Sequence, residues 1–408
     1  MAAPTSSFYP LANATPQDLA EICKVLWGWS PCSRWVQGEV CSQLSAGCSC
    51  SQAMRLEPFF DLYRNMTAFY LPDAVGSSHP ALRSHADLRD IVVLLRGNLE
   101  RPRIHLTTEY FTQREAEESK RPPLSDQNRA FNLAARVITM VQPAAENQSD
   151  GLLEAGSQPA LWSNDKSLVA FIGSVFPKRE HPTLSRGNDA TTTTKIHVSS
   201  IMAKRLKKIA KLKIIPTDDL ASHLSLDAKQ GTVAIFHYTS VLKEGLTNGN
   251  GHPSSEGVEG VEGVEGVEGV AARTNTRSNI PPQLAIETLA TIKEVLFPDD
   301  SVSQSMLRSL ISRDKFDPDM ARIIDLSGLD EPVRYQYWGS RLLDLHDEIE
   351  NPTPRGFFEK WLERKSGARY AMMATLIGLF IAILLGALGL IVSIFQAWVG
   401  WQQWQHPV

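Results

Sequence analysis

The chain has 408 residues, of which 43% are hydrophobic and 21% are charged, and its formal net charge is −4 at pH 7. This is the composition of a globular protein that is long enough for two or three domains. Because nucleic-acid binding usually requires a strongly basic face, the near-neutral balance excludes a whole-chain role of that kind, and we expect no nucleic-acid partner.

The first 30 residues do not resemble a targeting segment. No Lys or Arg precedes Lys24, and Asp18 and Glu21 interrupt the apolar positions. A secretory signal begins with basic residues before an apolar run, and a mitochondrial presequence is rich in Arg and poor in acids. We therefore expect neither kind of leader.

All five cysteines lie in an N-terminal segment, residues 1–55, which we treat as a region of its own. An odd number of cysteines cannot pair completely within one chain, and only two are as close together as paired zinc ligands usually are. We expect reduced, unconnected thiols, with disulfides or a metal site as alternatives, and we assign no metal or other cofactor. The cysteines are Cys23, Cys32, Cys41, Cys48 and Cys50.

Residues 56–245 are predicted to form a mainly helical soluble domain. Apolar residues recur at three- and four-residue intervals in 56–72, 85–99 and 128–141, as in helices that pack on one side, and prolines end these runs. The short apolar segment 167–176 fits a helix or a strand equally well.

Residues 199–216, SSIMAKRLKKIAKLKIIP, are the most highly charged stretch, and they fit a basic amphipathic helix. The plain interpretation is a packed helix with a solvated face. Docking on anionic lipid and a nuclear or nucleic-acid signal are the alternatives, and a membrane anchor elsewhere in the chain favours lipid. The lysines on the polar side are Lys204, Lys207, Lys208 and Lys211.

A small helix-strand-helix element is predicted next. Its parts are DDLASHL (218–224) with Thr217 as the cap, the strand TVAIFHY (232–238) and the helix TSVLKEGL (239–246). The unit resembles small winged modules that serve as adaptors, although such a likeness does not establish DNA binding. His237, within the strand, is expected to be a packed or surface histidine.

Residues 246–280 are predicted to be a disordered linker. They are rich in Gly, Asn, Ser and Glu and include five tandem Glu-Gly-Val triplets between residues 256 and 270. Such a repeat cannot build a core, so we expect its length to be dispensable. Beyond it, residues 281–369 are predicted to form a helical juxtamembrane subdomain with amphipathic helices in PPQLAIETLATIKEVLF, SVSQSMLRSLI, YWGSRLLDLHDEIE and FFEKWLERKS.

Residues 371–395 form a run of 25 residues without a charge, AMMATLIGLFIAILLGALGLIVSIF. At about 1.5 Å per residue this run reaches roughly 37 Å, which exceeds the hydrocarbon core of a bilayer at about 30 Å. We predict one transmembrane helix, followed by a short Trp-rich tail, residues 396–408. Its interfacial anchors are Tyr370, Trp398, Trp401 and Trp404.

The charge asymmetry around this helix predicts its orientation. Basic residues precede the helix and none follows it, which favours a cytosolic N-terminal bulk and a lumenal or extracellular C-terminus. Because only thirteen residues follow the span, we predict tail-anchored insertion after synthesis. The long span favours a secretory-pathway membrane over the mitochondrial outer membrane. The topology-setting residues are Arg355, Lys360, Arg364, Lys365 and Arg369.

Two further patterns bear on this orientation and on assembly. Gly378, Ala382 and Gly386 place small side chains on one face of the helix, where a second copy can approach, although incidental small residues give the same spacing. The glycosylation sequons are expected to be unused on a cytosolic domain. They begin at Asn13, Asn65 and Asn147.

No common catalytic motif is present. The sequence lacks a phosphate-binding loop, a dinucleotide-binding GxGxxG turn, a zinc-protease HExxH and a hydrolase GxSxG elbow. We therefore assign no catalytic or cofactor-binding residue.

Several stretches resemble a large family of uncharacterised filamentous-fungal membrane proteins. They include SSHPALRSHADLR, AKRLKKIAKLKIIPTDDLASHL, YWGSRLLDLHDEIENPTPRGFFEKWLERKSGARYAMMATLIG and FQAWVGWQQWQHPV, the last being the most specific. The likeness covers most of the chain from about residue 55 and implies one C-terminal span with no known activity. A distant comparison with metal-ion transporters fails, since those have two helices and a Gly-Met-Asn signature that this chain lacks.

We therefore predict a mainly α protein: a helical soluble region with a small helix-strand-helix element, and one C-terminal transmembrane helix. The favoured function is that of a tail-anchored adaptor or scaffold that presents a cytosolic helical domain to protein partners. The alternative is a membrane-bound accessory enzyme of a biosynthetic pathway with an unrecognised site. The expected partners are the lipid bilayer, a second copy of the chain and unidentified proteins.

Overall fold

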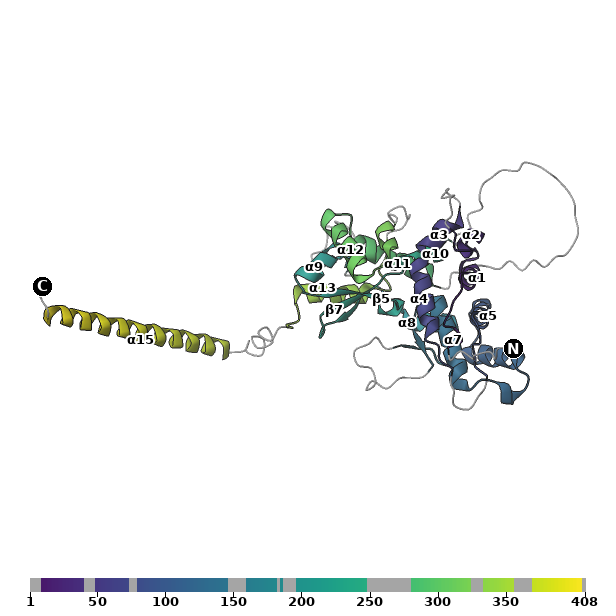
Figure 1. Cartoon of the computed structure of the whole chain (residues 1–408), viewed down its shortest axis with the longest axis horizontal. Helices are drawn as coiled ribbons and strands as arrows, with labels where there is room; N and C mark the ends of the chain where they lie inside the picture. Colours follow the sequence, from purple (N-terminus) through teal and green to yellow (C-terminus); the bar gives the residue numbers. More distant parts are fainter. Residues whose placement is uncertain are drawn as a thin grey trace, which may run out of the picture. The chain divides into compact units, whose positions relative to one another are not determined.

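The computed structural model describes residues 9–39, 48–72, 79–145, 159–181, 184–185, 196–247, 280–323, 333–355 and 369–405. The chain divides into two compact units, Met1–Pro352 and Thr353–Val408, which we call the folded unit and the anchor unit. The fold is mainly α with short strands, as the sequence predicts (Figure 1).

The first part of the folded unit is helical. It holds α1 (Pro16–Trp27), α2 (Ser33–Val36), α3 (Ser49–Arg55), α4 (Glu57–Ala68), α5 (His85–Gly97), α6 (Arg103–Arg114), η1 (Glu118–Lys120) and α7 (Leu124–Thr139). Capping boxes start two of them, Thr15 with Asp18 before α1 and Ser84 with Asp87 before α5. α1 stops at Gly28, whose φ of 77° is left-handed. The three helices predicted from apolar spacing in this part are confirmed as α4, α5 and α7.

Short pairs of strands follow. β1 (Pro143–Ala144) pairs in parallel with β2 (Ala160–Leu161), and β3 (Leu184–Ser185) pairs in parallel with β4 (Ile196–His197). Between these pairs lies α8 (Leu168–Val175), which settles the ambiguous apolar segment as a helix. Its N-cap is Ser167, whose side chain accepts a hydrogen bond from the N–H of Ala170.

The folded unit also contains a three-stranded sheet. Its strands are β5 (Lys213–Thr217), β6 (Ser225–Asp227) and β7 (Thr232–Phe236), in the order β5-β7-β6. β7 runs parallel to β5, with Ile214 opposite Val233, and antiparallel to β6, with Leu226 opposite the same valine. The predicted strand is thus β7, which ends at Phe236 and leaves His237 and Tyr238 outside it. The predicted helix that follows is α10 (Thr239–Thr247).

The long basic helix predicted over 199–216 is wrong. After η3 (Val198–Ser200), the helix α9 (Ala203–Lys208) makes under two turns, and Lys211 adopts a positive φ of 53° before β5 begins. Adjacent β-branched residues, Ile214 and Ile215, favour the strand. Pro216 is tolerated there because β5 is an edge strand.

The first helix of the predicted helix-strand-helix element is a single 3₁₀ turn, η4 (Leu220–Ser222). Its cap is Asp219, whose Oδ1 accepts from the N–H of Ala221 at 3.1 Å. The expected cap, Thr217, is instead the last residue of β5, and its hydroxyl accepts from the N–H of Asp219 at 3.2 Å.

Helices also follow the segment 248–279, which lies outside the described residues. They are α11 (Pro282–Ala290), a π-helical continuation η5 (Thr291–Leu296), α12 (Ser301–Asp314), the 3₁₀ turn η6 (Pro318–Arg322) and α13 (Gly339–Glu350). α9 packs on α12 and α13, and α10 packs on α11 (Figure 1). Segments on either side of the predicted linker therefore belong to one compact unit.

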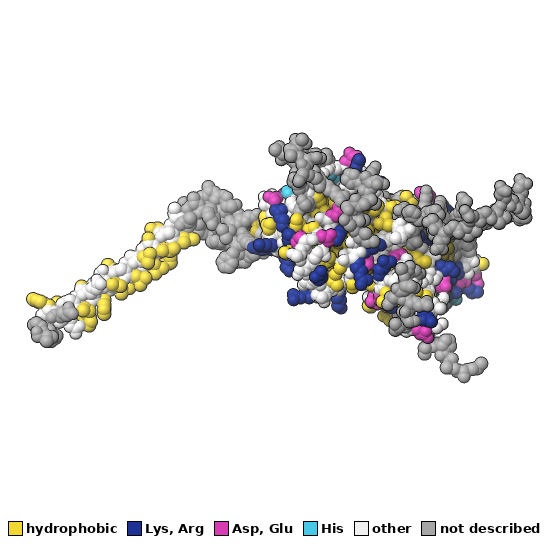
Figure 2. Space-filling model, turned by 90° about the horizontal axis from the view of Figure 1, so that it is seen from above, with side chains coloured by type: hydrophobic (Ala, Val, Ile, Leu, Met, Phe, Trp, Pro, Cys, Tyr) yellow, Lys and Arg dark blue, Asp and Glu magenta, His cyan; other side chains and the backbone are white. Residues whose placement is uncertain are grey.

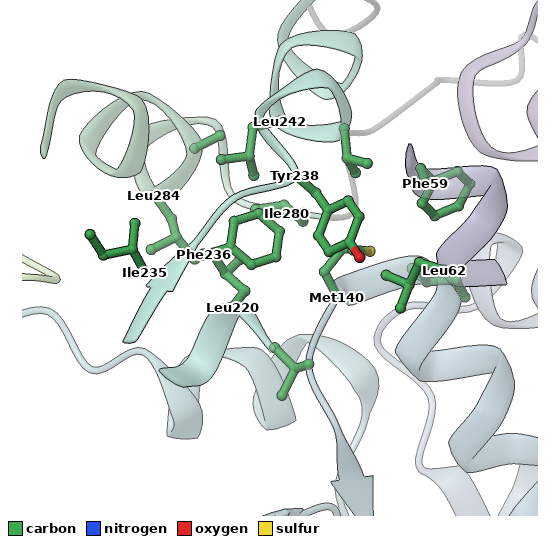
Figure 3. Close-up of a cluster of buried hydrophobic side chains, with 14 of the residues drawn as sticks. Phe59, Leu62, Met140, Leu220, Ile235, Phe236, Tyr238, Leu242, Ile280 and Leu284 are labelled. Atoms are coloured by element: carbon green, nitrogen blue, oxygen red, sulfur yellow. The ribbon is translucent and has the colours of Figure 1, made fainter. Parts of the chain in front are cut away.

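The core explains this joint folding. Figure 3 shows Phe59 and Leu62 of α4 close to Tyr238, which follows β7, and Leu242 of α10 near Leu284 of α11. All five side chains are buried. Because burial of one such side chain stabilises a fold by about 1.5–3 kcal/mol, this shared cluster holds the N-terminal helices, the sheet and the later helices together.

The anchor unit contains one long helix, α15 (Arg369–Gln405). Its 28-residue stretch Thr375–Gln402 is long and apolar enough to cross a bilayer, and within the described residues no other helix meets that test. Figure 2 shows this helix as an arm with hydrophobic side chains and no Lys or Arg among its coloured residues. The helix continues past the predicted end at Phe395 and includes the three tryptophans.

Candidate functional site

A groove of about 450 Å³ opens on the folded unit between α3, the start of α4 and η6. We call it the α3–η6 groove. Its walls combine apolar and charged side chains from two segments that are more than 250 residues apart in sequence. They are Ser51, Met54, Arg55, Pro58, Asp317, Pro318, Asp319 and Arg322.

Polar contacts with α10 hold the η6 side of the groove. The ammonium of Lys243 donates to Oδ2 of Asp319 at 2.6 Å and to the carbonyls of Asp319 and Arg322 at 3.2 and 3.1 Å. The hydroxyl of Ser240 donates to Oδ2 of Asp317 at 3.2 Å, and the N–H of Asp319 donates to Oδ1 of Asp317 at 2.8 Å. These bonds tie the two carboxylates to α10 and to the start of η6.

Burial raises the pKa of Asp317 to about 6, and the neighbouring carboxylate of Asp319 acts in the same direction. The hydrogen bonds from the N–H of Asp319 and from Ser240, together with the charge of Lys243, oppose the shift. A carboxyl with such a pKa can exchange a proton near neutrality. Both of its oxygens, however, already accept hydrogen bonds from the protein.

His237 contacts Asp317, the N-cap residue of η6. Its Nδ1 accepts a hydrogen bond from the N–H of Asp317 at 3.0 Å, and its ring packs against Tyr238 and Phe316. Burial lowers the pKa of His237 to about 4, so the ring is neutral at pH 7. Of the two settings expected for this histidine, packed or on the surface, the structure shows the packed one.

The rim opposite η6 is formed by α3. The guanidinium of Arg55 pairs with Glu244 of α10 at 3.2 Å, and burial raises the pKa of that glutamate. Met54 is 62% exposed, an unusual exposure for a large apolar side chain beside a groove. With Arg322 also exposed, the groove offers solvent an apolar surface flanked by guanidinium groups.

Three of the five N-terminal cysteines come together at α3, which forms this rim. Cys32 and Cys50 are joined as a disulfide, so the expectation of unconnected thiols is wrong for these two residues. The sulfur of Cys48 completes a group of three, in which all sulfurs lie within 4.8 Å of one another. Cys23 is buried in the core, and burial raises the pKa of its thiol. Cys41 lies outside the described residues.

The predicted basic residues do not form one helical face. Lys204 pairs with Asp300 at 3.3 Å, whereas Lys207, Lys208 and Lys211 are exposed at the end of α9 and in the turn before β5. Near them, Arg205 lies 3.7 Å from Glu350 at the end of α13, and the folded unit ends two residues later. The exposed lysines are therefore on the part of the folded unit from which the chain leaves toward the anchor unit.

The residues predicted to act at the membrane lie partly within the described chain. Gly378, Ala382 and Gly386 are on α15, and a Cβ added at either glycine would meet no other atom. The tryptophans 398, 401 and 404 are exposed on the same helix. Tyr370 and Arg369 belong to its first turn, and Arg355 precedes it. The predicted helix FFEKWLERKS, with Lys360, Arg364 and Lys365, lies outside the described residues.

The sequons occupy different settings. Asn13 is exposed just before α1. Asn65 is exposed within α4, but the hydroxyl of its partner Thr67 is buried and donates to the carbonyl of Tyr63 at 2.9 Å. The folded helix therefore does not offer that sequon to an enzyme. Asn147 lies outside the described residues.

Sequence reasoning missed the groove and two buried polar centres. Glu287 accepts hydrogen bonds from the backbone N–H groups of residues 336, 337 and 338. His223 contacts Thr291 at 2.8 Å and packs edge-on against Trp338. The available signals were a glutamate on the apolar side of α11 and a histidine two residues before the short strand β6, neither of which identifies its partner.

Comparison of the chain with protein-family models, with curated proteins and with solved structures finds no match.

Proposed function

We propose that this protein is a membrane-anchored adaptor, in which α15 crosses the bilayer and the folded unit binds a protein partner on the cytosolic side. The observation that carries the proposal is the apolar stretch Thr375–Gln402, which is exposed along its length and joined to a separate unit with its own core. Such a helix finds its favourable environment in a bilayer. An orientation with the folded unit in the cytosol is supported by the basic residues before the helix.

The α3–η6 groove is the proposed docking site for the partner. An exposed methionine adapts its shape to different apolar side chains, and guanidinium groups pair with carboxylates in forked geometry. The groove therefore suits a peptide segment that places an apolar side chain on Met54 and an acidic side chain near Arg322. The polar contacts of Asp317 and Asp319 with α10 keep the wall in place before the partner binds.

The orientation is tested by protease protection. Full-length protein with an epitope tag at each end is inserted into microsomes and digested with protease. A digested N-terminal tag, a protected C-terminal tag and no glycan on Asn13 are expected. A protected and glycosylated folded unit would overturn the cytosolic orientation.

Docking is tested by placing a photo-crosslinking amino acid at Met54 in the full-length protein in cells. Val302 on α12, which is 59% exposed against 62% for Met54, is the matched control position. We expect crosslinked protein at position 54 that is absent at position 302 and is lost with Arg322→Glu. The same products at both positions would contradict docking in the groove.

An accessory enzyme is the second candidate, because the groove contains clustered titratable groups, including Asp317 with its pKa of about 6. We favour the adaptor, since the Asp317 oxygens are occupied by the N–H of Asp319 and by Ser240. The enzyme would need Asp317 as its acid or base. If cells that carry the Asp317→Asn variant lost a metabolite that wild-type cells make, while crosslinking from position 54 was retained, this result would favour the enzyme.

A further inference from the structure

The cysteine group beside the groove has the arrangement of a soft-metal site. The residue before α2 supplies one sulfur, and the residue before α3 and the second residue of α3 supply the others. These are Cys32, Cys48 and Cys50, whose sulfurs all lie within 4.8 Å of one another. Cys50 is buried and the other two are partly buried.

This spacing fits zinc. A Zn–S distance of about 2.3 Å with tetrahedral angles places two sulfurs roughly 3.8 Å apart. The three cysteine sulfurs lie within 4.8 Å of one another, which is close enough for one ion to reach all three once the disulfide is reduced. Three thiolates leave one tetrahedral position, which a water molecule takes in zinc sites with three protein ligands. Carboxylate-binding ions such as Mg²⁺ and Ca²⁺ are disfavoured by an all-sulfur donor set.

The disulfide between Cys32 and Cys50 defines the other state of the group. Two glutathione molecules reduce this bond, yielding two cysteine thiols and one glutathione disulfide. The cytosol maintains glutathione in its reduced form, so a disulfide in a protein there is generally transient. The metal-binding state in the cell therefore rests on the cytosolic orientation proposed above. The zinc affinity of the purified, reduced protein does not depend on that orientation.

We infer that Cys32, Cys48 and Cys50, when reduced, form a zinc-binding site, and that oxidation to the Cys32–Cys50 disulfide releases the ion. On binding, the three thiols lose three protons and Zn²⁺ accepts three sulfur ligands. On release, glutathione disulfide oxidises two of these sulfurs to the protein disulfide and is itself reduced to two glutathione molecules. Three protons are taken up, two by the glutathione thiolates and one by the remaining cysteine thiolate.

The position of the site connects it to the groove. The sulfurs join the start of α2 to α3, and α3 carries Ser51, Met54 and Arg55, which line one wall. A metal that holds α3 at its N-terminal end fixes this wall.

The test uses the full-length protein, purified in detergent and reduced with a phosphine. Metal analysis after removal of free ion is expected to give about one Zn²⁺ per chain, falling to near zero in Cys32→Ser, Cys48→Ser and Cys50→Ser. Cys23→Ala is the matched control and is expected to retain the ion, because Cys23 is buried in the core and does not belong to the group of three. Treatment of the wild type with glutathione disulfide is expected to release the zinc.

A second measurement does not depend on the folding of the variants. In the reduced wild type, Zn²⁺ is expected to protect Cys32, Cys48 and Cys50 from alkylation, as identified by peptide mass spectrometry. Equal alkylation of these cysteines with and without Zn²⁺ would overturn the site, whatever the orientation of the protein. Zinc binding to the purified chain together with a lumenal folded unit would overturn the proposed orientation and leave the site intact.

Discussion

The ammonium of Lys243 and Oδ2 of Asp319 lie 2.6 Å apart, although 76 residues separate them in sequence. Lys243 belongs to α10, before the predicted linker, and Asp319 belongs to η6, after it. The side chain of Asp319 is 3% exposed and that of Lys243 is 19% exposed. This ion pair therefore joins the two sides of the linker inside the protein and positions one wall of the groove.

Removing the charge of Lys243 is expected to destabilise the folded unit. Lys243→Met keeps most of the side chain but leaves the Asp319 carboxylate buried without its counter-ion, and the expected loss is about 3 kcal/mol of unfolding free energy. Urea unfolding of the full-length protein, followed by near-ultraviolet circular dichroism, measures this loss. The control is Lys120→Met, because the pair of Lys120 with Glu117 is exposed and its loss should cost less than about 1 kcal/mol. Equal losses in the two variants would contradict a structural role for the buried pair.

The buried carboxyl of Glu287 is expected to make stability depend on pH. Burial raises its pKa to about 7, although the N–H groups of residues 336–338 act in the opposite direction. Because this folded-state pKa lies above the ordinary value of 4.5, the folded protein binds the proton more tightly than the unfolded chain does. The stabilisation from this proton is complete below about pH 4.5 and is lost as the pH rises to about 7.

The variant Glu287→Gln measures this effect. The difference in unfolding free energy, wild type minus variant, is expected to fall by up to about 3 kcal/mol between pH 4.5 and pH 7. Buried histidines such as His237 impose the opposite pH dependence, but they are common to both proteins and cancel in the difference. Parallel stability curves over this range would show that Glu287 has the same pKa in the folded and unfolded states.

Patterns that repeat within one element were predictable from sequence. Apolar spacing identified α4, α5 and α7, and the run without charges identified α15. The segment from 199 to 216 was misassigned, because its lysines and apolar residues satisfy a helical period while Ile214 and Ile215 form an edge strand that depends on β7 as its partner. Pairing of β5 with β7 therefore overrides the helical periodicity of this segment.

The groove could not be predicted because its residues come from distant parts of the chain. Nothing near Arg55 indicates a pairing with Glu244, 189 residues away. Likewise, the spacing of Cys32, Cys48 and Cys50 matches no common zinc pattern, and only the folded chain brings the sulfurs together. Local periodicity therefore indicated the elements, whereas the site depends on long-range contacts.

Deleting the Glu-Gly-Val repeats, residues 256–270, is expected to leave the fold intact. The ends of the segment, Thr247 and Ile280, are held by the packing of α10 on α11. Shortening the connection to about half its length lowers the entropic cost of loop closure by roughly 0.6 kcal/mol. Thermal unfolding should therefore show an unchanged or slightly raised Tm, and a fall of several degrees would indicate that the repeats contribute contacts.

The lysines near the end of the folded unit are expected to promote binding to anionic lipid. Lys207, Lys208 and Lys211 are exposed near Glu350, where the chain leaves for the anchor unit. Each basic residue at an anionic surface contributes about 1 kcal/mol, so replacing all three with Gln should weaken binding roughly a hundredfold. Flotation of the unit 1–352 with phosphatidylserine liposomes measures this change.

A charge-matched variant controls that experiment. Lys24, Lys120 and Lys315 are exposed and lie outside α9, so their replacement with Gln removes the same charge from other parts of the surface. This variant should bind nearly as well as the wild type. An equal loss in both variants would mean that net charge alone, rather than the lysines near the chain exit, governs attraction to the lipid.

The small residues of α15 are expected to mediate self-association in the bilayer. Gly378, Ala382 and Gly386 lie four residues apart and so share one side of the helix, where close contact with a second helix gains van der Waals packing. Gly378→Leu with Gly386→Leu should cost about 1–2 kcal/mol of association free energy, or roughly a tenfold increase in the Kd. Energy transfer between labelled full-length chains in liposomes measures the Kd. Ala387→Leu, on the opposite side of the helix, should leave it unchanged, and an equal effect of that control would rule out a specific packing face.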